Sequence, residues 1–223
     1  LLAGVVPHAE RVAVARGLLG VLVGALLEAA RGLRTRVSVV VLAAAVASVA
    51  VVSGGDPGVF AMAAAVCEAI EAGPAPWREI ELTIVPGVTA MLAVAARAGA
   101  PLGHDFCAIS LSDNLKAWTT VERRLKAAAE ADFVIALYNP ASKARPHQLG
   151  RAFDLLRSIK AAATPVLFVR AAGTPDAKIV TTTLAAAAGT LADMRTLVIV
   201  GASTTRQVGR WVYTPRREPG AQP

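Results

Sequence analysis

From residue 49 onward the chain repeats one pattern, in which a short apolar run is followed by a loop rich in Gly or Pro and then by a longer stretch with helical spacing. Short apolar runs predict buried strands, and the longer stretches predict helices. Such alternation is typical of an α/β sheet, for which we expect mainly parallel strands. The pattern predicts strands over residues 49–52, 80–85, 108–111, 133–137, 165–169, 178–182 and 196–200, and helices over residues 59–71, 88–97, 119–131 and 146–159, the third capped by Thr119 or Thr120.

Residues 1–48 do not follow this pattern. They are apolar and interrupted by glycines, and they offer one helix candidate over residues 18–30 but no clear strand. The apolar segment 37–52 is shorter than the roughly 20 residues that a membrane-spanning helix needs, so we expect no membrane partner. A fresh pattern begins after Gly103-His104, which predicts an N-terminal domain over residues 1–105, a C-terminal domain over residues 106–215 and a tail over residues 216–223.

The composition narrows the class of protein. With 55% hydrophobic and 17% charged residues, the chain is expected to fold, and its 223 residues suffice for two small domains. A net charge of +7 favours an anionic partner, but no long Lys/Arg run and only 4% aromatic residues make a nucleic-acid-binding module the least favoured function. Two cysteines, Cys67 and Cys107, cannot build a disulfide framework or a zinc site, and we expect both to be buried thiols of a cytoplasmic protein.

Three loops with small residues follow predicted strands. They begin at Gly54, Pro86 and Gly201. In open α/β sheets, ligands bind beyond the carboxyl ends of the strands, and glycine lets the backbone approach a ligand closely. Ordinary tight turns are the alternative explanation for each loop taken alone. Because neither GxGxxG nor GxxxxGK[ST] occurs, the sequence gives no support to a dinucleotide site or a P-loop.

Four longer strings carry a family resemblance. They are SGGDPGVFAMAAAV at 53–66, VPGVTAMLAVAARAGAPLGHDF at 85–106, ISLSDNLKAW at 109–118 and AEADFVIALYNPASKARPHQL at 129–149. Together they resemble the tetrapyrrole (corrin/porphyrin) methylase family over about residues 49–214. The last two strings are most similar to those members that methylate C17 of precorrin-3B.

The resemblance implies a fold and an activity. The fold is α/β, with two domains and an active-site cleft between them, and the assembly is a homodimer. The activity is S-adenosylmethionine-dependent C17-methylation of precorrin-3B to precorrin-4 in cobalamin biosynthesis, with ring contraction and with S-adenosylhomocysteine as the second product. The partner is therefore a small tetrapyrrole polycarboxylate, which suits the positive charge of the chain.

The resemblance also implies a set of donor-binding residues. Each is a position of this chain that matches a loop of the family around the methyl donor. These residues are Gly55, Asp56, Val59 and Phe60 in the first loop, Thr89 and Ala90 in the second, Leu137, Tyr138 and Asn139 between the domains, and Gly173, Thr174, Gly201 and Ala202 in the C-terminal domain.

Ring contraction calls for a general acid or base, and Asp113 and Ser112 are our preferred candidates because they lie in the string most specific to the C17 enzymes. A turn with a helix cap is the alternative for Asp113. His104 and Lys116 are further candidates. Neither a metal nor a covalent nucleophile is needed, and no His/Cys spacing suggests a metal site. Arginines that are candidates for pairing with substrate carboxylates are Arg97, Arg123, Arg145 and Arg170.

One family feature is missing. Residues 1–48 contain no GxGPG-type loop, which in the family follows the first strand and borders the active site. Two alternatives therefore stay open beside C17-methylation. One is a methylase of another ring position, and the other is a chain that binds the donor without transferring its methyl group.

Overall fold

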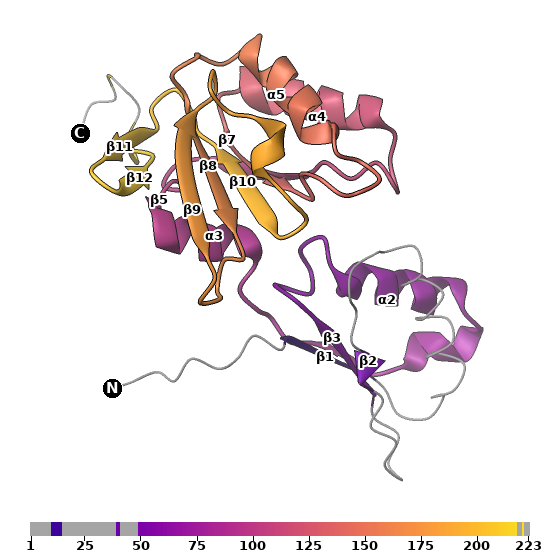
Figure 1. Ribbon diagram of the computed structural model, residues 1–223. Coiled ribbons are helices and arrows are strands. Elements are labelled where there is room, and N and C mark those ends of the chain that lie inside the picture. Colours follow the sequence, from indigo (N-terminus) through magenta and orange to yellow (C-terminus); the bar gives the residue numbers. More distant parts are fainter. Residues whose placement is uncertain (1–9, 15–38, 41–48, 218–219, 221–223) are drawn as a thin grey trace, which may run out of the picture. The chain divides into compact units, whose positions relative to one another are not determined.

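The computed structural model describes residues 10–14, 39–40, 49–217 and 220 (Figure 1). The chain divides into two compact units, Leu1–Thr89 and Ala90–Pro223. Both combine helices with sheet, so the expected mixed α/β class is confirmed. The helix expected over residues 18–30 lies outside the described residues.

The first unit contains a four-stranded sheet with strand order β2-β3-β1-β4, and the helix α2 packs against it. β3 and β4 both pair antiparallel with β1, which is a strand that we did not expect from the sequence. Val51 of β3 packs with Met62 and Val66 of α2 and with Trp77, and this cluster forms the core of the unit. The elements are β1 (Glu10–Val14), β2 (Val39–Val40), β3 (Val49–Ser53), α2 (Met62–Ala72), the 3-10 helix η1 (Ala75–Glu79) and β4 (Leu82–Ile84).

The second unit is built on a five-stranded sheet with strand order β6-β7-β10-β8-β9. β6 and β7 are parallel, whereas β10 runs antiparallel to both of its neighbours, β7 and β8. As a result β6, β7 and β8 finish at the same end of the sheet, which we call the site end, and β10 finishes at the opposite end. The strands are β6 (Phe106–Ser110), β7 (Val134–Tyr138), β8 (Pro165–Arg170), β9 (Lys178–Thr183) and β10 (Thr196–Val200).

Helices cover both faces of this sheet (Figure 1). Successive side chains of β7 alternate between the faces, so that Ile135 and Leu137 join the core under α4 and α5, while Val134 and Ala136 join the core that contains Val94 of α3. The helices are α3 (Ala90–Ala98), α4 (Trp118–Glu130) and α5 (Gln148–Arg157), with a 3-10 helix η2 at Gly189–Leu191.

A small three-stranded sheet with order β11-β12-β5 lies beside α3. Its strands are β5 (Gly99–Ala100), β11 (Arg206–Val208) and β12 (Trp211–Tyr213). β5 pairs parallel with β12, with Gly99 in register with Val212, although the two segments are distant in the sequence. None of the three strands was expected, because strands of two or three residues carry no periodic pattern.

Several expectations from the sequence are corrected. Mainly parallel pairing was expected, but in the five-stranded sheet only β6 and β7 pair in parallel. The N-cap of α4 is Ala117, with no side-chain cap, rather than Thr119 or Thr120. Cys67 is exposed and Cys107 is half-buried, so neither is a fully buried thiol.

The division between the compact units falls after residue 89, whereas the sequence suggested a boundary after residue 105. The difference concerns α3, whose Val94 and Ala98 pack in one cluster with Leu197 and Ile199 of β10. Burial of the apolar side of α3 against this sheet therefore joins the helix to the second unit. Among the described residues, no helix combines the length and the apolar content that crossing a membrane requires.

Candidate functional site

In the first unit, Asp56 joins two of the loops that the sequence singled out. Its Oδ1 accepts a hydrogen bond of 2.8 Å from the backbone N of Gly58, and its Oδ2 accepts one of 3.0 Å from the backbone N of Gly87. Hydrogen bonds to a carboxylate are stronger than those between neutral groups. Both oxygens thus hold the loop after β3 against the loop after β4, which makes Asp56 a positioning residue in this structure.

The loop after β3 has an unusual backbone conformation. Gly55 has a φ of 83°, and Phe60 has a φ of 52°, a left-handed value that is uncommon for a residue with a Cβ. The Phe60 side chain is 48% exposed. Strained backbone of this kind is frequent at ligand sites. Both residues are among those implied to bind the donor.

In the second unit, Tyr138 and Asn139 lie at the end of β7, at the site end. The hydroxyl of Tyr138 accepts a 3.0 Å hydrogen bond from the backbone N of Met91, in the first turn of α3. Asn139 has a φ of 52°, and its Nδ2 donates to Oγ of Ser110 at 2.9 Å. The backbone N of Ser112 donates to the same Oγ at 3.3 Å. These bonds connect the ends of β6 and β7 to each other and to the start of α3.

The loop after β8 reaches the same end of the sheet, since Arg170 is the register partner of Thr196 and Leu137 is that of Val198. Ala171 is in the left-handed region with a φ of 52°, and Gly173 has a φ of 84°. The hydroxyl of Thr174 donates to the carbonyl of Ala171 at 2.9 Å. Gly173 and Thr174 therefore belong to a loop at the same end of the sheet as Asn139.

Asp113 and Ser112 follow β6 at the site end, as the sequence led us to expect. Oδ1 of Asp113 lies 3.6 Å from Nη1 of Arg145. Oγ of Ser112 accepts a long bond of 3.5 Å from the backbone N of Asn114, whereas Asp113 does not cap α4, whose N-cap is Ala117. Burial lowers the pKa of Lys116, the charge of Arg124 lowers it further, and Asp113 acts in the opposite direction. Lys116 is thus a partly desolvated cation beside a carboxylate.

Other residues implied by the resemblance lie elsewhere. Gly201 and Ala202 follow β10 and lie at the end opposite the site end, next to Asp132, whose carboxylate accepts from the backbone N of Ser203 at 2.9 Å. The side chain of Leu137 is fully buried in the core under α4 and α5. The mainly parallel strands that we expected would have placed the loop after β10 at the site end.

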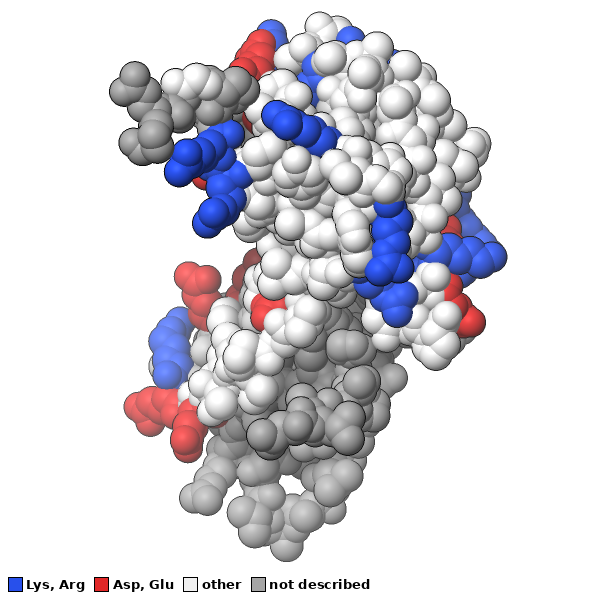
Figure 2. All heavy atoms as spheres, turned by 90° about the vertical axis from the view of Figure 1, so that its left-hand side faces the viewer, with Lys and Arg blue, Asp and Glu red and all other residues white. Residues whose placement is uncertain are grey.

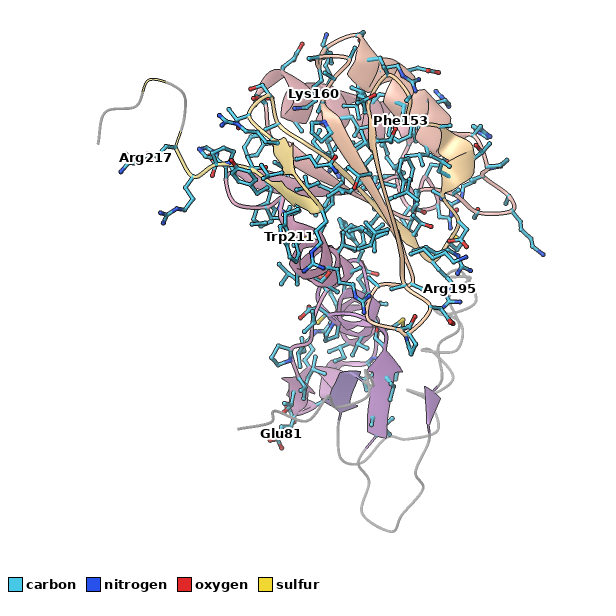
Figure 3. The ribbon with its side chains drawn as sticks, turned by 60° about the vertical axis from the view of Figure 1, so that its left-hand side comes forward. Glu81, Phe153, Lys160, Arg195, Trp211 and Arg217 are labelled. Atoms are coloured by element: carbon cyan, nitrogen blue, oxygen red, sulfur yellow. The ribbon has the colours of Figure 1, made fainter. Side chains whose placement is uncertain are left out.

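The other candidates for proton transfer and for pairing with substrate carboxylates do not lie together. His104 precedes β6, at the end opposite Ser112, and its Nδ1 accepts a 2.8 Å hydrogen bond from the backbone N of Asp105. Arg170 is paired with Asp193 at 2.7 Å. Figure 3 shows Lys160 and Arg195 at opposite ends of the second unit, which agrees with the strand directions.

On the face shown in Figure 2, Lys and Arg side chains lie in separate groups with uncharged surface between them. No group of three or more His, Cys, Asp or Glu residues is arranged to hold a metal ion in the part of the chain that the structure describes.

Sequence reasoning did not find the roles of Met91, Ser110 and Gln148. Met91 contributes its backbone N–H, and such a role cannot be inferred from the type of residue. Ser110 is a buried strand residue that accepts hydrogen bonds from two loops. Gln148 is an ordinary polar residue in the sequence, but only 1% of it is exposed. Its burial depends on the packing of α5, which the local pattern does not encode.

Known proteins share these features of sequence and fold. A sequence profile described as Tetrapyrrole (Corrin/Porphyrin) Methylases matches residues 12–188. The precorrin-3B C(17)-methyltransferase of a Sinorhizobium species is 66% identical over 184 residues, which cover 80% of this chain and 72% of that protein. A probable cobalt-factor III C(17)-methyltransferase of Salmonella typhimurium is 46% identical over 175 residues, which cover 78% of this chain and 71% of that protein.

A solved structure is also similar. The crystal structure of the methyltransferase CobJ has a TM-score of 0.70 and 56% sequence identity, over 72% of this chain and 67% of that one. The profile match crosses the division after residue 89, so the similarity includes loops of both compact units.

Proposed function

The chain belongs to the tetrapyrrole methylase family, and on this premise we propose that it is an S-adenosylmethionine-dependent C17-methyltransferase of cobalamin biosynthesis. Its substrate is precorrin-3B and its product is precorrin-4, formed with contraction of the macrocycle. The observation that carries the proposal is the 66% identity over 184 residues with the Sinorhizobium enzyme of that name.

The methyl donor is held by loops of both units. In the first unit, Gly55, Asp56, Val59, Phe60 and Thr89 belong to the two loops that the Asp56 carboxylate joins. The exposed apolar side chain of Phe60 and the open backbone at Gly55, where an added Cβ would meet nothing within 4 Å, suit a ligand with a flat ring and polar ends. In the second unit the donor-binding residues are Ala90, Tyr138, Asn139, Gly173 and Thr174.

The roles of Leu137, Gly201 and Ala202 change within this proposal. Leu137 supports the site from the core and makes no side-chain contact with the donor, because it is fully buried. We propose that Gly201 and Ala202 do not contact the donor, and the direction of β10, which finishes at the end of the sheet away from Asn139, supports this. The two-domain arrangement with an intervening cleft remains part of the proposal.

When bound, the donor supplies an electrophilic methyl group on its sulfonium. The protein must then align the donor with the substrate, since reacting atoms must be held about 3–3.5 Å apart. The hydrogen bonds from Asn139 to Ser110 and from Met91 to Tyr138 fix the backbone on which this alignment depends. Asp113 and Ser112, which follow β6, are the candidates for the proton transfer that ring contraction needs.

The proposal includes a homodimer that works in the cytoplasm and binds neither nucleic acid nor membrane. Two alternatives differ in substrate or outcome. Methylation at another ring position is disfavoured because the SLSDNLKAW string is most similar to that of the C17 enzymes. Donor binding without transfer is the outcome expected if residues 1–48 do not complete the active site.

A calorimetric titration followed by a transfer assay tests the proposal. We expect S-adenosylmethionine to bind, and precorrin-3B to gain one methyl group detected by mass spectrometry, with cobalt-factor III assayed in parallel. The variant Thr174→Val is expected to weaken donor binding, while Thr119→Val, in the exposed first turn of α4, is the matched control. Failure to bind the donor contradicts the proposal, and binding without transfer to either tetrapyrrole favours the inactive alternative.

A further inference from the structure

Arg145 has a fixed backbone and a largely buried side chain. Its backbone N donates to the carbonyl of Ser142 at 3.0 Å, and the backbone N of Ser142 donates to the carbonyl of Arg145 at 3.2 Å. These reciprocal bonds close a tight turn between β7 and α5. The side chain is only 16% exposed. The turn therefore holds a guanidinium at a defined place near the site end.

Few of the N–H groups of this guanidinium make a contact. Both contacts come from Nη1, one to Oε1 of Gln148 at 3.4 Å and one to Oδ1 of Asp113 at 3.6 Å. A well-formed bond between a guanidinium and a carboxylate is about 2.7–2.9 Å long. Among the described residues, Nε and Nη2 have no partner. A cation that has lost most of its water but has no close anion is costly, so the arrangement fits a receptor without its ligand.

Gln148 provides a second, independent polar group that is buried and unpaired among the described residues. Its Nε2 is buried and has no hydrogen-bond acceptor in the described part of the chain. The other atom of the same amide, Oε1, faces Arg145, so the unpaired N–H groups lie beside the guanidinium. Buried polar groups in native proteins nearly always have a partner. An anion with two oxygens would supply acceptors to both residues.

The pair has a second cation and one carboxylate as charged neighbours. Lys116 is a second, partly desolvated cation, with its pKa lowered by burial and by Arg124. Asp113 is the carboxylate near both cations, and it makes only a long contact to Arg145. The cluster follows β6 and β7 at the site end, as Asn139 and Ser112 do. A carboxylate of a ligand at this end would meet two cations and one neutral donor.

We propose that Arg145 and Gln148 form a subsite for one carboxylate of the tetrapyrrole substrate, with Lys116 as a second cation. This inference rests on the proposed function, because that function supplies a polycarboxylate ligand. A planar guanidinium can bind a carboxylate through two parallel N–H groups, and the free Nε and Nη2 of Arg145 offer such a pair. Asp113 then loses its contact to Arg145 when the substrate binds.

The test measures the affinity for precorrin-3B by absorbance titration with S-adenosylhomocysteine present, so that no turnover occurs. The variants are Arg145→Gln and Gln148→Leu. The control is Lys126→Gln, which removes one positive charge from an exposed position of α4 that has no proposed role in binding. We expect Arg145→Gln to raise Kd for precorrin-3B by about tenfold to 100-fold, as for a lost charge-assisted hydrogen bond, and to leave donor affinity unchanged.

Gln148→Leu separates binding from structure. If Gln148 has only a structural role, its replacement by Leu will lower the melting temperature. A subsite glutamine should weaken precorrin-3B binding while the melting temperature stays equal or rises, because an unpaired buried amide is removed. If the wild-type chain methylates precorrin-3B but both variants bind it like Lys126→Gln, the subsite is wrong and the proposed function stands. If the wild-type chain does not bind precorrin-3B, both are wrong.

Discussion

At the scale of single residues, Asp56 is the most informative side chain of the first unit. It accepts hydrogen bonds from Gly58 and Gly87, so the substitution Asp56→Asn removes the charge and leaves one backbone N–H facing an amide NH₂ group. We expect the Kd for S-adenosylmethionine to rise about tenfold, since a hydrogen bond to a charged group contributes about 1.5–3 kcal/mol. Calorimetric titration checks this, with Glu68→Gln on the exposed side of α2 as control. Equal donor affinity in Asp56→Asn and Glu68→Gln would show that the loops do not depend on this carboxylate.

Residue types could be predicted more readily than their partners. The strings of the sequence identified Asp56, Asn139 and Asp113 as residues of interest. Their partners include a backbone N–H of Gly87, the hydroxyl of Ser110 and the guanidinium of Arg145. Each of these partners is brought in by tertiary packing of segments that are distant in sequence. The role of Asp56 in holding two loops together therefore required the structure.

At the scale of elements, Asp132 ties together the start of β7, the segment after α5 and the loop after β10. It accepts from Nζ of Lys160 at 2.9 Å and from Oγ of Ser203 at 2.5 Å. Burial alone would raise the pKa of Asp132, but the hydrogen bonds from Ser203 and Lys160 outweigh it and hold this pKa below its ordinary value. Because the folded-state pKa is depressed, the carboxylate stabilises the fold above its unfolded-state pKa of about 4, and this is lost as pH falls.

We therefore expect Asp132→Asn to destabilise the protein by about 1 kcal/mol at neutral pH, an estimate that allows for solvent screening at a half-exposed site. Asn tolerates the left-handed φ of 54° at this position, so the substitution isolates the charge. Thermal unfolding of both proteins from pH 7 to pH 3 checks this. The difference in melting temperature should shrink below about pH 4. A difference that stays constant over this range would assign the effect to shape rather than charge.

The loop after β10 provides a second test at this scale. A Cβ on Gly201 would lie 2.7 Å from Cβ of Thr205, whose side chain is buried and whose Oγ1 accepts from the backbone N of Ala202. Gly201→Ala is expected to destabilise the fold by about 1–3 kcal/mol through overpacking, and to leave donor affinity unchanged. Gly150→Ala in α5, where a Cβ meets nothing within 4 Å, is the control. Chemical denaturation and donor titration measure both effects, and a loss of donor affinity confined to Gly201→Ala would return this loop to the donor site.

Strand positions were predictable, whereas strand directions were not. The expected strand over residues 196–200 is β10 as found, and β8 and β9 each differ from expectation by one residue at the carboxyl end. A buried apolar run indicates that a strand is buried, but it does not indicate whether the strand pairs parallel or antiparallel with its neighbours. The antiparallel insertion of β10 between β7 and β8 therefore could not be predicted, and neither could the position of Gly201.

At the scale of the whole molecule, the net charge of +7 should affect the two ligands differently. Attraction between a positively charged protein and a polycarboxylate weakens as salt screens it, with a Debye length of about 10 Å at 0.1 M and about 3 Å at 1 M. We expect KM for precorrin-3B to rise with sodium chloride concentration more steeply than KM for S-adenosylmethionine. Initial rates at several salt concentrations check this, and parallel changes in the two KM values would contradict a role for charge in substrate capture.

The proposed activity is defined by the carbon that receives the methyl group. The most direct measurement supplies precorrin-3B and S-adenosylmethionine labelled with ¹³C in the methyl group, and then locates the label in the product by NMR. We expect one labelled methyl group, attached to C17 of a ring-contracted macrocycle. A label on any other carbon, or a chain that binds the donor and leaves the tetrapyrrole unlabelled, would contradict C17-methylation.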